Sequence, residues 1–395
     1  MGYAKYLTSL EKFGVNLGLE RIAYLLEELG DPHLKFRSIH IAGTNGKGST
    51  AAMIASILKE AGYKVGLYTS PHLFDYTERI KINGKDIPRR DFAAGLKLVQ
   101  KIANYQTTKP PNNPTVFEVL TAVAFGYFAK KKVEYAVVEV GMGGRLDATN
   151  VITPLVSVIT NIDLEHTAIL GRTLAKVAAE KAAIIKRGVP VITAETKPEA
   201  LRVIKHNADK NRSLLIQVGS SPPHQKFWCG GIGAGLETGL IGEHQKTNAA
   251  CAVAAVRMAN IPASKQAVLR GLKKVSWPGR FQVLSRKPLT IADGAHNPAG
   301  IKVLVDTLRD QYPGKKFTFI FGTQEDKDSA SMLNSLKPLA KKVIITHSSH
   351  QNAANKDSVS LKEVLKQTSG ADRVITGSLF LVADVLKCRY RHRYR

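Results

Sequence analysis

The segment that most constrains the fold is a glycine-rich loop between an apolar run and an amphipathic stretch. Residues 38–42 are apolar apart from Ser38 and His40, residues 43–50 read GTNGKGST, and an alanine-rich stretch follows. A strand, a glycine loop and a helix in this order direct backbone N–H groups and a helix N-terminus at one anion. We therefore predict that the loop binds a nucleotide phosphate through Thr44, Asn45, Gly46, Lys47, Gly48, Ser49 and Thr50.

The chemistry of the loop supports this prediction over a plain glycine-rich turn. Lys47 adds a mobile positive charge, and the hydroxyl of Ser49 or Thr50 can bind magnesium. The spacing differs from the common pattern G-x-x-x-x-G-K-[ST], because the glycine run is shorter and Gly48 separates Lys47 from Ser49.

Short apolar runs alternate with longer amphipathic stretches along the chain, which is typical of βαβ units and a parallel sheet. We expect strands at 38–42, 65–69, 135–140, 156–160 and 189–193, and helices at 49–61, 118–130 and 247–259. Residues 218–242 are rich in Gly, Ser and Pro and are predicted to form a loop or hairpin region.

The alternation restarts after Trp277-Pro278-Gly279, with apolar runs at 289–292, 317–321 and 342–346. We therefore predict an α/β protein with two domains. Residues 1–280 would form a P-loop-type domain with a mainly parallel sheet, and residues 286–395 a smaller Rossmann-like α/β domain.

The charge balance of 57 Lys and Arg against 32 Asp and Glu gives a net charge of +25, which attracts polyanions of every kind. The basic residues are spread along the chain and do not alternate with aromatic residues, so we expect no nucleic-acid partner. Three cysteines, Cys229, Cys251 and Cys388, lack metal-type spacing and indicate reduced thiols. With neither a signal-like start nor a membrane-length apolar run, we expect a cytoplasmic protein. We also expect a monomer.

The loop GTNGKGS resembles that of the folate branch of the Mur ligase superfamily, the dihydrofolate synthase/folylpolyglutamate synthase family. In the murein branch a hydroxyl residue follows the lysine directly. The resemblance extends over nearly the whole chain, through segments 18–22, 70–73, 76–80, 139–150, 163–166, 180–186, 242–245 with Asn248, 278–281 and 293–298.

One or two magnesium ions are expected beside the loop. Glu139 ends an apolar strand, and a carboxylate there faces the ligand crevice of an α/β sheet. Hard cations prefer such oxygen donors and bridge substrate phosphates. His166 follows another strand toward the same crevice. The resemblance implies that Ser70 is a ligand and that Lys181 is carbamylated, which would let it hold a second ion.

The same resemblance implies roles for five residues around ATP and glutamate. Asn248 and Asp293 would hold the adenosine portion and Arg280 the phosphates, while His296 and Ser378 would serve the phosphate or glutamate side. The pterin pocket would draw on Val15, Asn16, Leu17, Thr115, Val116, Phe117, Glu118, Leu146, Asp147 and Ala148. Phe117 also fits an ordinary core position at the start of an amphipathic helix.

The implied activity is an ATP-dependent amide ligase that joins L-glutamate to dihydropteroate or reduced folates through an acyl phosphate and releases ADP and phosphate. The residues leave the acceptor open, and we expect both to be used. A murein-type ligase is disfavoured because only 42 residues precede Gly43. A nucleic-acid-dependent ATPase fits the charge, but no helicase or RNA-binding motif accompanies the loop.

Overall fold

The computed structural model describes residues 2–105, 113–219 and 237–389. They divide into two compact units, the first made of residues 1–239 and 246–275 and the second of residues 240–245 and 276–395. The second unit begins at Ser276, beside the segment where the sequence indicated a boundary, and it also takes in residues 240–245. Cys229 and most of the predicted loop region, residues 220–236, lie outside the described residues.

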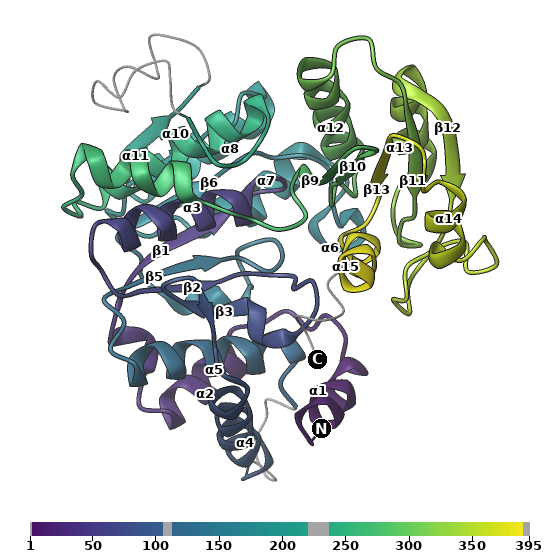
Figure 1. The fold of residues 1–395 in the computed structure, drawn as a ribbon. Coiled ribbons are helices and arrows are strands. Elements are labelled where there is room, and N and C mark those ends of the chain that lie inside the picture. Colours follow the sequence, from purple (N-terminus) through teal and green to yellow (C-terminus); the bar gives the residue numbers. More distant parts are fainter. Residues whose placement is uncertain (1, 106–112, 220–236, 390–395) are drawn as a thin grey trace. The chain divides into compact units, whose positions relative to one another are not determined.

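The first unit contains an eight-stranded sheet in the order β4-β3-β2-β5-β1-β6-β7-β8 (Figure 1). Neighbours from β2 to β8 pair in parallel, whereas β2–β3 and β3–β4 are antiparallel. The predicted mainly parallel sheet is confirmed. Its strands are β1 Arg37–Ala42, β2 Val65–Tyr68, β3 Ile80–Ile82, β4 Lys85–Asp86, β5 Tyr135–Glu139, β6 Val156–Ile159, β7 Val191–Thr193 and β8 Leu215–Gln217.

Strand β7 is shorter than the apolar run predicted. It begins directly after Pro190, which has no N–H to donate to the ladder. The central strands β1, β5 and β6 are almost wholly buried, as expected of parallel strands covered on both faces.

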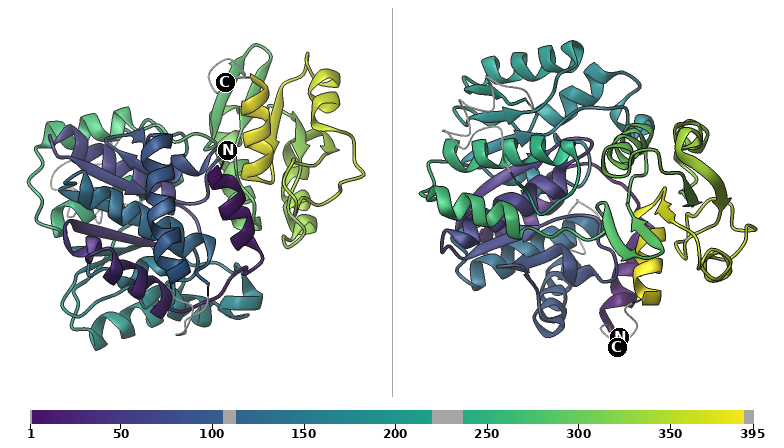
Figure 2. Two further views of the ribbon diagram at one scale, coloured as in Figure 1. Left: turned by 90° about the horizontal axis from the view of Figure 1, so that it is seen from below. Right: turned by 45° about the horizontal axis from the view of Figure 1, so that its top comes forward.

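Helices cover both faces of this sheet (Figures 1 and 2). Helix α3, with α11 packed along it, lies on one face, and α5 with α2 and α4 lies on the other. The helices are α1 Gly2–Glu11, α2 Glu20–Glu28, α3 Lys47–Glu60, α4 Arg89–Tyr105, α5 Val116–Lys130, α6 Thr167–Leu170, α7 Leu174–Ala182, α8 Pro198–Lys210, α10 Glu243–Met258 and α11 Lys265–Lys274, with 3-10 turns η1 Pro32–Leu34, η2 Tyr76–Arg79 and η3 Ala148–Val151.

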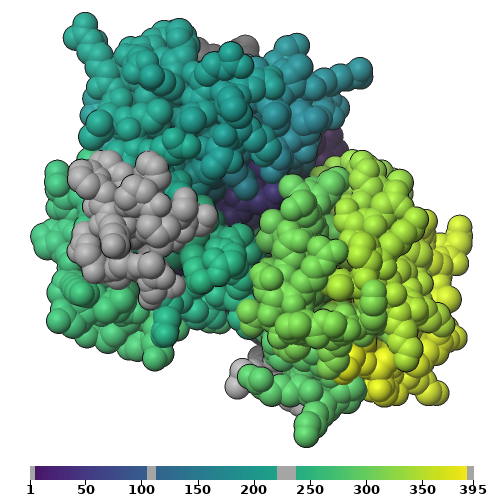
Figure 3. Space-filling model, turned by 90° about the horizontal axis from the view of Figure 1, so that it is seen from above, coloured from purple at the N-terminus to yellow at the C-terminus, as the bar shows by residue number. Residues whose placement is uncertain are grey.

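Helix α8 shows how sequence pattern places a helix on the surface. Pro198 begins it, where the missing N–H costs nothing. Ala200, Ile204 and Ala208 recur every four residues and are buried against α7, and polar residues fill the outer side. The segment containing α8 accordingly forms part of the teal surface in Figure 3.

The second unit has a five-stranded sheet in the order β12-β11-β13-β10-β9, parallel except for β9, which confirms a second, smaller α/β domain. Asn297 caps α12 by accepting from the N–H of Gly300, and Pro298 starts the helix. The elements are β9 Gln282–Arg286, β10 Leu289–Ala292, α12 Pro298–Gln311, β11 Phe317–Phe321, α13 Ser329–Leu336, η4 Lys337–Leu339, β12 Ala340–Ile345, α14 Leu361–Gln367, β13 Arg373–Thr376 and α15 Leu379–Arg389.

No helix in the described ranges combines the length and the apolar character needed to cross a membrane.

Candidate functional site

The predicted phosphate loop connects β1 to α3, as the sequence indicated, and two of its glycines are required by geometry. Gly43 has φ +142°, and a Cβ there would lie 1.9 Å from Thr160 Oγ1. Gly46 has φ +86° at the N-cap of α3, and a Cβ there would lie 2.5 Å from Asn248 Oδ1. Larger residues would push the loop off its supports, so both positions need glycine.

The segment that follows β6 holds the loop in shape. Asn161 accepts from Thr44 N with its carbonyl and from Asn45 N with its Oδ1, both at 2.8 Å. Thr160 Oγ1 donates to the Asn45 carbonyl at 2.6 Å. The N–H of Asp163 donates to Thr44 Oγ1 at 3.0 Å. Two neighbouring parallel strands therefore build one rigid anion cradle at their carboxyl ends.

Two lysines from different helices converge on the carbonyl of Gly43. Lys47 Nζ donates to it at 2.7 Å and to the Thr44 carbonyl at 3.0 Å. Lys181 Nζ, on α7 and only 2% exposed, donates to the same Gly43 carbonyl at 3.0 Å and to Glu165. The structure therefore brings Lys181 to the phosphate loop, 138 residues away in sequence.

Glu165 and Lys181 form a buried ion pair with shifted pKa values. Burial favours the neutral form of Glu165, but Lys47, Lys181 and His166 all face it and lower its pKa to about 2. Lys181 is more deeply buried and has Lys47 nearby, so its pKa falls to about 8 although Glu165 opposes the shift. A pKa of about 8 leaves roughly a tenth of the Lys181 amine neutral at pH 7.

Two of the predicted magnesium ligands meet at the end of β5. Glu139 is buried, and its Oε2 accepts from the Ser70 N–H at 3.1 Å. Within the described ranges, no three His, Cys, Asp or Glu side chains gather closely enough to hold a metal unaided. The oxygens of Ser70 and Glu139 therefore fit a magnesium ion that also takes oxygens from a nucleotide. Lys181 as an ammonium does not fit a metal.

Three further predicted residues lie at the loop or beside it. Ser49 and Thr50 are buried in the first turn of α3, and the Thr50 hydroxyl makes no hydrogen bond within the described part of the chain. His166 precedes α6 in a left-handed conformation, with φ 47°. It contributes to the site through its charge on Glu165.

Arg21 joins two of the segments predicted for the pterin. Its Nε donates to both carboxylate oxygens of Glu118, at 2.9 and 3.0 Å, and its Nη2 donates to the Asn16 carbonyl. Glu118 also forms a capping box with Thr115 at the start of α5. Thr115 and Glu118 thus have a structural role. The flanking Val15 and Leu17 are exposed apolar side chains, 56% and 37% accessible.

Phe117 and Asp147 meet at the loop that follows Glu139. A Cβ at Gly141 would lie 2.5 Å from Phe117 Cζ, so the ring packs directly on that backbone. Phe117 also stacks on Tyr68 at 5.8 Å and packs against the core, in keeping with its alternative interpretation. Asp147 Oδ2 accepts from the Met142 N–H at 2.9 Å. Leu146 and Ala148 flank Asp147, and Val116 begins α5 beside Phe117.

The remaining predicted residues cluster in the second unit. Asp293 accepts from the N–H groups of Phe281 at 2.7 Å and Ala295 at 2.9 Å. A Cβ at Gly294 would lie 2.7 Å from Arg280 Nη1. His296 Nδ1 lies 2.9 Å from the Gly294 carbonyl, which can only accept, so Nδ1 carries the proton.

Ser378 joins this cluster because β13 runs parallel to β10. Its Oγ accepts from the Phe380 N–H at 3.1 Å at the start of α15, and the preceding Gly377 donates its N–H to the Ala295 carbonyl. Asp293, His296 and Ser378 therefore lie just after the carboxyl ends of β10 and β13, and Arg280 lies just before β9, which pairs antiparallel with β10.

Sequence reasoning missed Arg21, Glu165 and His244. Arg21 and Glu165 stood inside motifs already noted but received no role. His244, in the segment GEHQ, carries charge interactions with Asp293 and Arg280, and burial lowers its pKa. A carboxylate directly before His166 was the available signal for Glu165.

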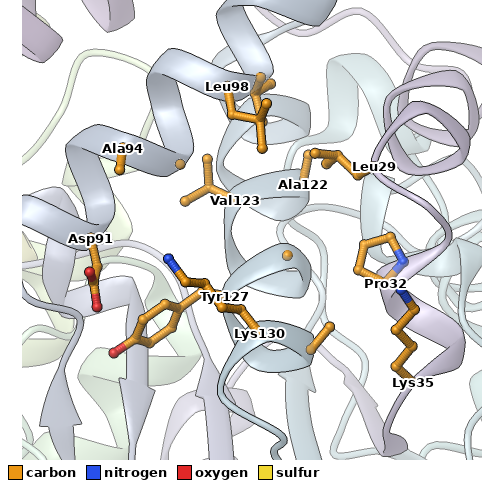
Figure 4. Close-up of a pocket in the computed structure, with 14 residues that line it drawn as sticks. Leu29, Pro32, Lys35, Asp91, Ala94, Leu98, Ala122, Val123, Tyr127 and Lys130 are labelled. Carbon is orange, nitrogen blue, oxygen red and sulfur yellow. The ribbon is translucent and has the colours of Figure 1, made fainter.

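A separate cavity of about 460 Å³ lies between α4, α5 and the segment after α2 (Figure 4). Its floor is apolar, with Ala122 and Val123 from α5 and Leu98 from α4, and Gly126 leaves part of it open. None of the predicted site residues lines it. The first turn of α5 therefore contributes residues to the candidate site, and its second half lines the cavity.

Two family models match the chain. The Mur ligase middle domain matches residues 41–256, and the glutamate ligase domain of Mur ligases matches residues 279–384. The chain is also similar to dihydrofolate synthase/folylpolyglutamate synthase from Bacillus subtilis, with 35% identity over 95% of this chain and 96% of that protein.

Solved structures agree over the full length. Folylpolyglutamate synthase from Thermotoga maritima has a TM-score of 0.85 and 34% identity, covering 100% of this chain and 98% of that one. E. coli FolC in complex with DHPP and ADP has a TM-score of 0.88 and 30% identity, covering 99% and 98%. The chain therefore belongs to the Mur ligase superfamily and, within it, to the dihydrofolate synthase/folylpolyglutamate synthase family.

Proposed function

We propose that this protein is an ATP-dependent ligase that adds L-glutamate to dihydropteroate, to reduced folates, or to both. The observation that carries the proposal is the glycine loop with Lys47 at the carboxyl edge of the sheet, next to Ser70 and Glu139. Similarity over nearly the full length to proteins named for this activity supports it.

The arrangement suits activation of a carboxylate. A carboxylate does not couple to an amine by itself, because its oxygen is too poor a leaving group. Transfer of the γ-phosphoryl group to the carboxylate oxygen breaks the bond between the β- and γ-phosphates and releases ADP. The glutamate amine then attacks the carbonyl carbon, phosphate leaves, and the amine loses a proton.

Charge on the transferring phosphoryl group must be neutralised by the protein. The backbone N–H groups of the loop and the Lys47 ammonium would hold the phosphates, and positive groups placed in advance are worth several kcal/mol of barrier. Ser70 and Glu139 would hold a magnesium ion, which supplies further positive charge at the phosphate oxygens when bound.

Lys181 is the candidate for modification. We propose that its amine carries a carbamate, which would change a cation into an oxygen ligand for a second magnesium ion. The pKa of about 8 supports this, because only a neutral amine attacks carbon dioxide. Glu165, its ion-pair partner, would lose that pairing on modification and could turn to Lys47, which already lowers its pKa.

The other predicted residues keep the roles expected of them as proposals. Asn248, packed against Gly46, would contact the nucleotide, as would Asp293. Arg280 would reach the phosphates, and His296 with Ser378 would serve the phosphate or glutamate side. The exposed Val15 and Leu17, with Phe117 and Asp147, would contact the acceptor.

The proposal is tested by incubating the purified protein with magnesium-ATP, L-glutamate and either dihydropteroate or tetrahydrofolate. Mass spectrometry should find products longer by one glutamyl group. Lys47→Ala should abolish turnover, whereas Lys59→Ala, on the exposed side of the same helix, should not. Lack of product with both acceptors would refute the assignment, and activity in Lys47→Ala would mean that the phosphate site has been misplaced.

A further inference from the structure

A buried chain of three side chains links the middle of β1 to the loop after β5. His40 Nε2 lies 2.8 Å from Thr149 Oγ1, and Thr149 Oγ1 lies 2.5 Å from Asp147 Oδ1. His40 and Thr149 are fully buried and Asp147 is 4% exposed. His40 and Thr149 are 109 residues apart in sequence.

The number of available protons determines which group donates in each of these hydrogen bonds. The Thr149 hydroxyl has one proton and donates it to Asp147 Oδ1. It must then accept from His40, so His40 carries its proton on Nε2. His40 Nδ1 is buried and makes no hydrogen bond to any residue of the described ranges.

Hydrogen-bond donation in the opposite direction, from Asp147 toward His40, is disfavoured. If Asp147 donated to Thr149 and Thr149 donated to His40 Nε2, the imidazole proton would move to Nδ1. A buried N–H without an acceptor is costly, whereas a buried lone pair costs less. Burial also lowers the pKa of His40 to about 3, which keeps the ring neutral.

Both carboxylate oxygens of Asp147 accept hydrogen bonds. Its Oδ1 accepts from the Thr149 N–H at 3.0 Å as well as from the hydroxyl, and its Oδ2 accepts from Met142 N at 2.9 Å. Burial raises the pKa of Asp147, and the hydrogen bonds from Thr149, Met142 and the Gly141 N–H oppose that rise. The backbone that these bonds hold is the one on which the Phe117 ring packs.

We propose that His40 is a positioning residue of the acceptor site, which orients the Thr149 hydroxyl so that Asp147 holds the Gly141–Met142 backbone under Phe117. This inference rests on the proposed function, since Phe117 and Asp147 contact the pterin acceptor only if the protein is such a ligase. His40 touches no reactant, and its effect passes through Thr149.

The test compares Thr149→Val, which removes the hydroxyl at nearly constant shape, with Thr149→Ser, which retains it. Thr149→Val should raise the KM for the pterin acceptor about tenfold, while the KM for ATP changes less than twofold. Thr149→Ser should restore most of the acceptor KM. Equal behaviour of the two variants, or equal changes in both KM values, would refute the inference.

A second measurement does not depend on turnover. Nitrogen-15 NMR of histidine-labelled wild-type protein should show a buried, neutral imidazole with its proton on Nε2, whose signals do not titrate between pH 5 and 8. The resonance is assigned by its loss in His40→Gln. A proton on Nδ1 would overturn the inference. Absence of glutamylated product in wild type would instead reject the proposed function, and it would not change the NMR result for the proton on His40 Nε2.

Discussion

Replacing Glu165 by glutamine tests the electrostatics of the phosphate loop. In protein whose Lys181 is not carbamylated, the carboxylate is 12% exposed and pairs with Lys181, which is 2% exposed. Its pKa falls from 4.5 to about 2. At about 1.4 kcal/mol per tenfold change in proton affinity, this corresponds to roughly 3 kcal/mol of folding free energy at pH 7.

The sign of the pH dependence follows from the lowered pKa. The stabilising effect of Glu165 is complete above pH 4.5 and is lost as the pH falls toward 2, because the folded protein then has to take up the proton. The deficit of Glu165→Gln should therefore shrink from roughly 3 kcal/mol at pH 7 to roughly 2 kcal/mol at pH 3.5.

Urea denaturation of wild type and variant at the two pH values measures this difference. Glu180→Gln is the matched control, since Glu180 pairs with the half-exposed Arg145 at the surface and its loss should cost less than about 1 kcal/mol. A Glu165→Gln deficit no larger than that of the control, or one that is the same at pH 7 and pH 3.5, would refute the reasoning.

Three further outcomes are expected. Gly126→Ala should raise the free energy of unfolding by about 0.5–1 kcal/mol in urea titrations, because a Cβ at this helical position meets nothing within 4 Å; a loss would contradict the open cavity. Arg21→Met should cost about 3–5 kcal/mol by the same assay, because it leaves Glu118 buried without its cation; a cost below about 1 kcal/mol would contradict that pairing. Protein supplied with carbon-13 bicarbonate should show a carbamate NMR signal that Lys181→Gln lacks, and its absence from wild type would reject the modification.

Short sequence segments were enough to predict much of the fold. An apolar run, GTNGKGST and an alanine-rich stretch specify β1, the loop and α3, because strand burial, glycine conformations and helix propensity act over a few neighbouring residues. Strand ends such as Glu139 were also predictable, because parallel strands present their carboxyl ends at one edge.

Only the tertiary structure decided which distant side chains meet. Lys181 reaches the Gly43 carbonyl, Arg21 reaches Glu118 and His40 reaches Thr149 across 138, 97 and 109 residues of chain. Periodicity reports which face of an element is buried, but it does not report which partner another element will bring to that face. Hydrogen-bond direction and pKa depend on that partner, and they emerge only when the strands and helices have packed.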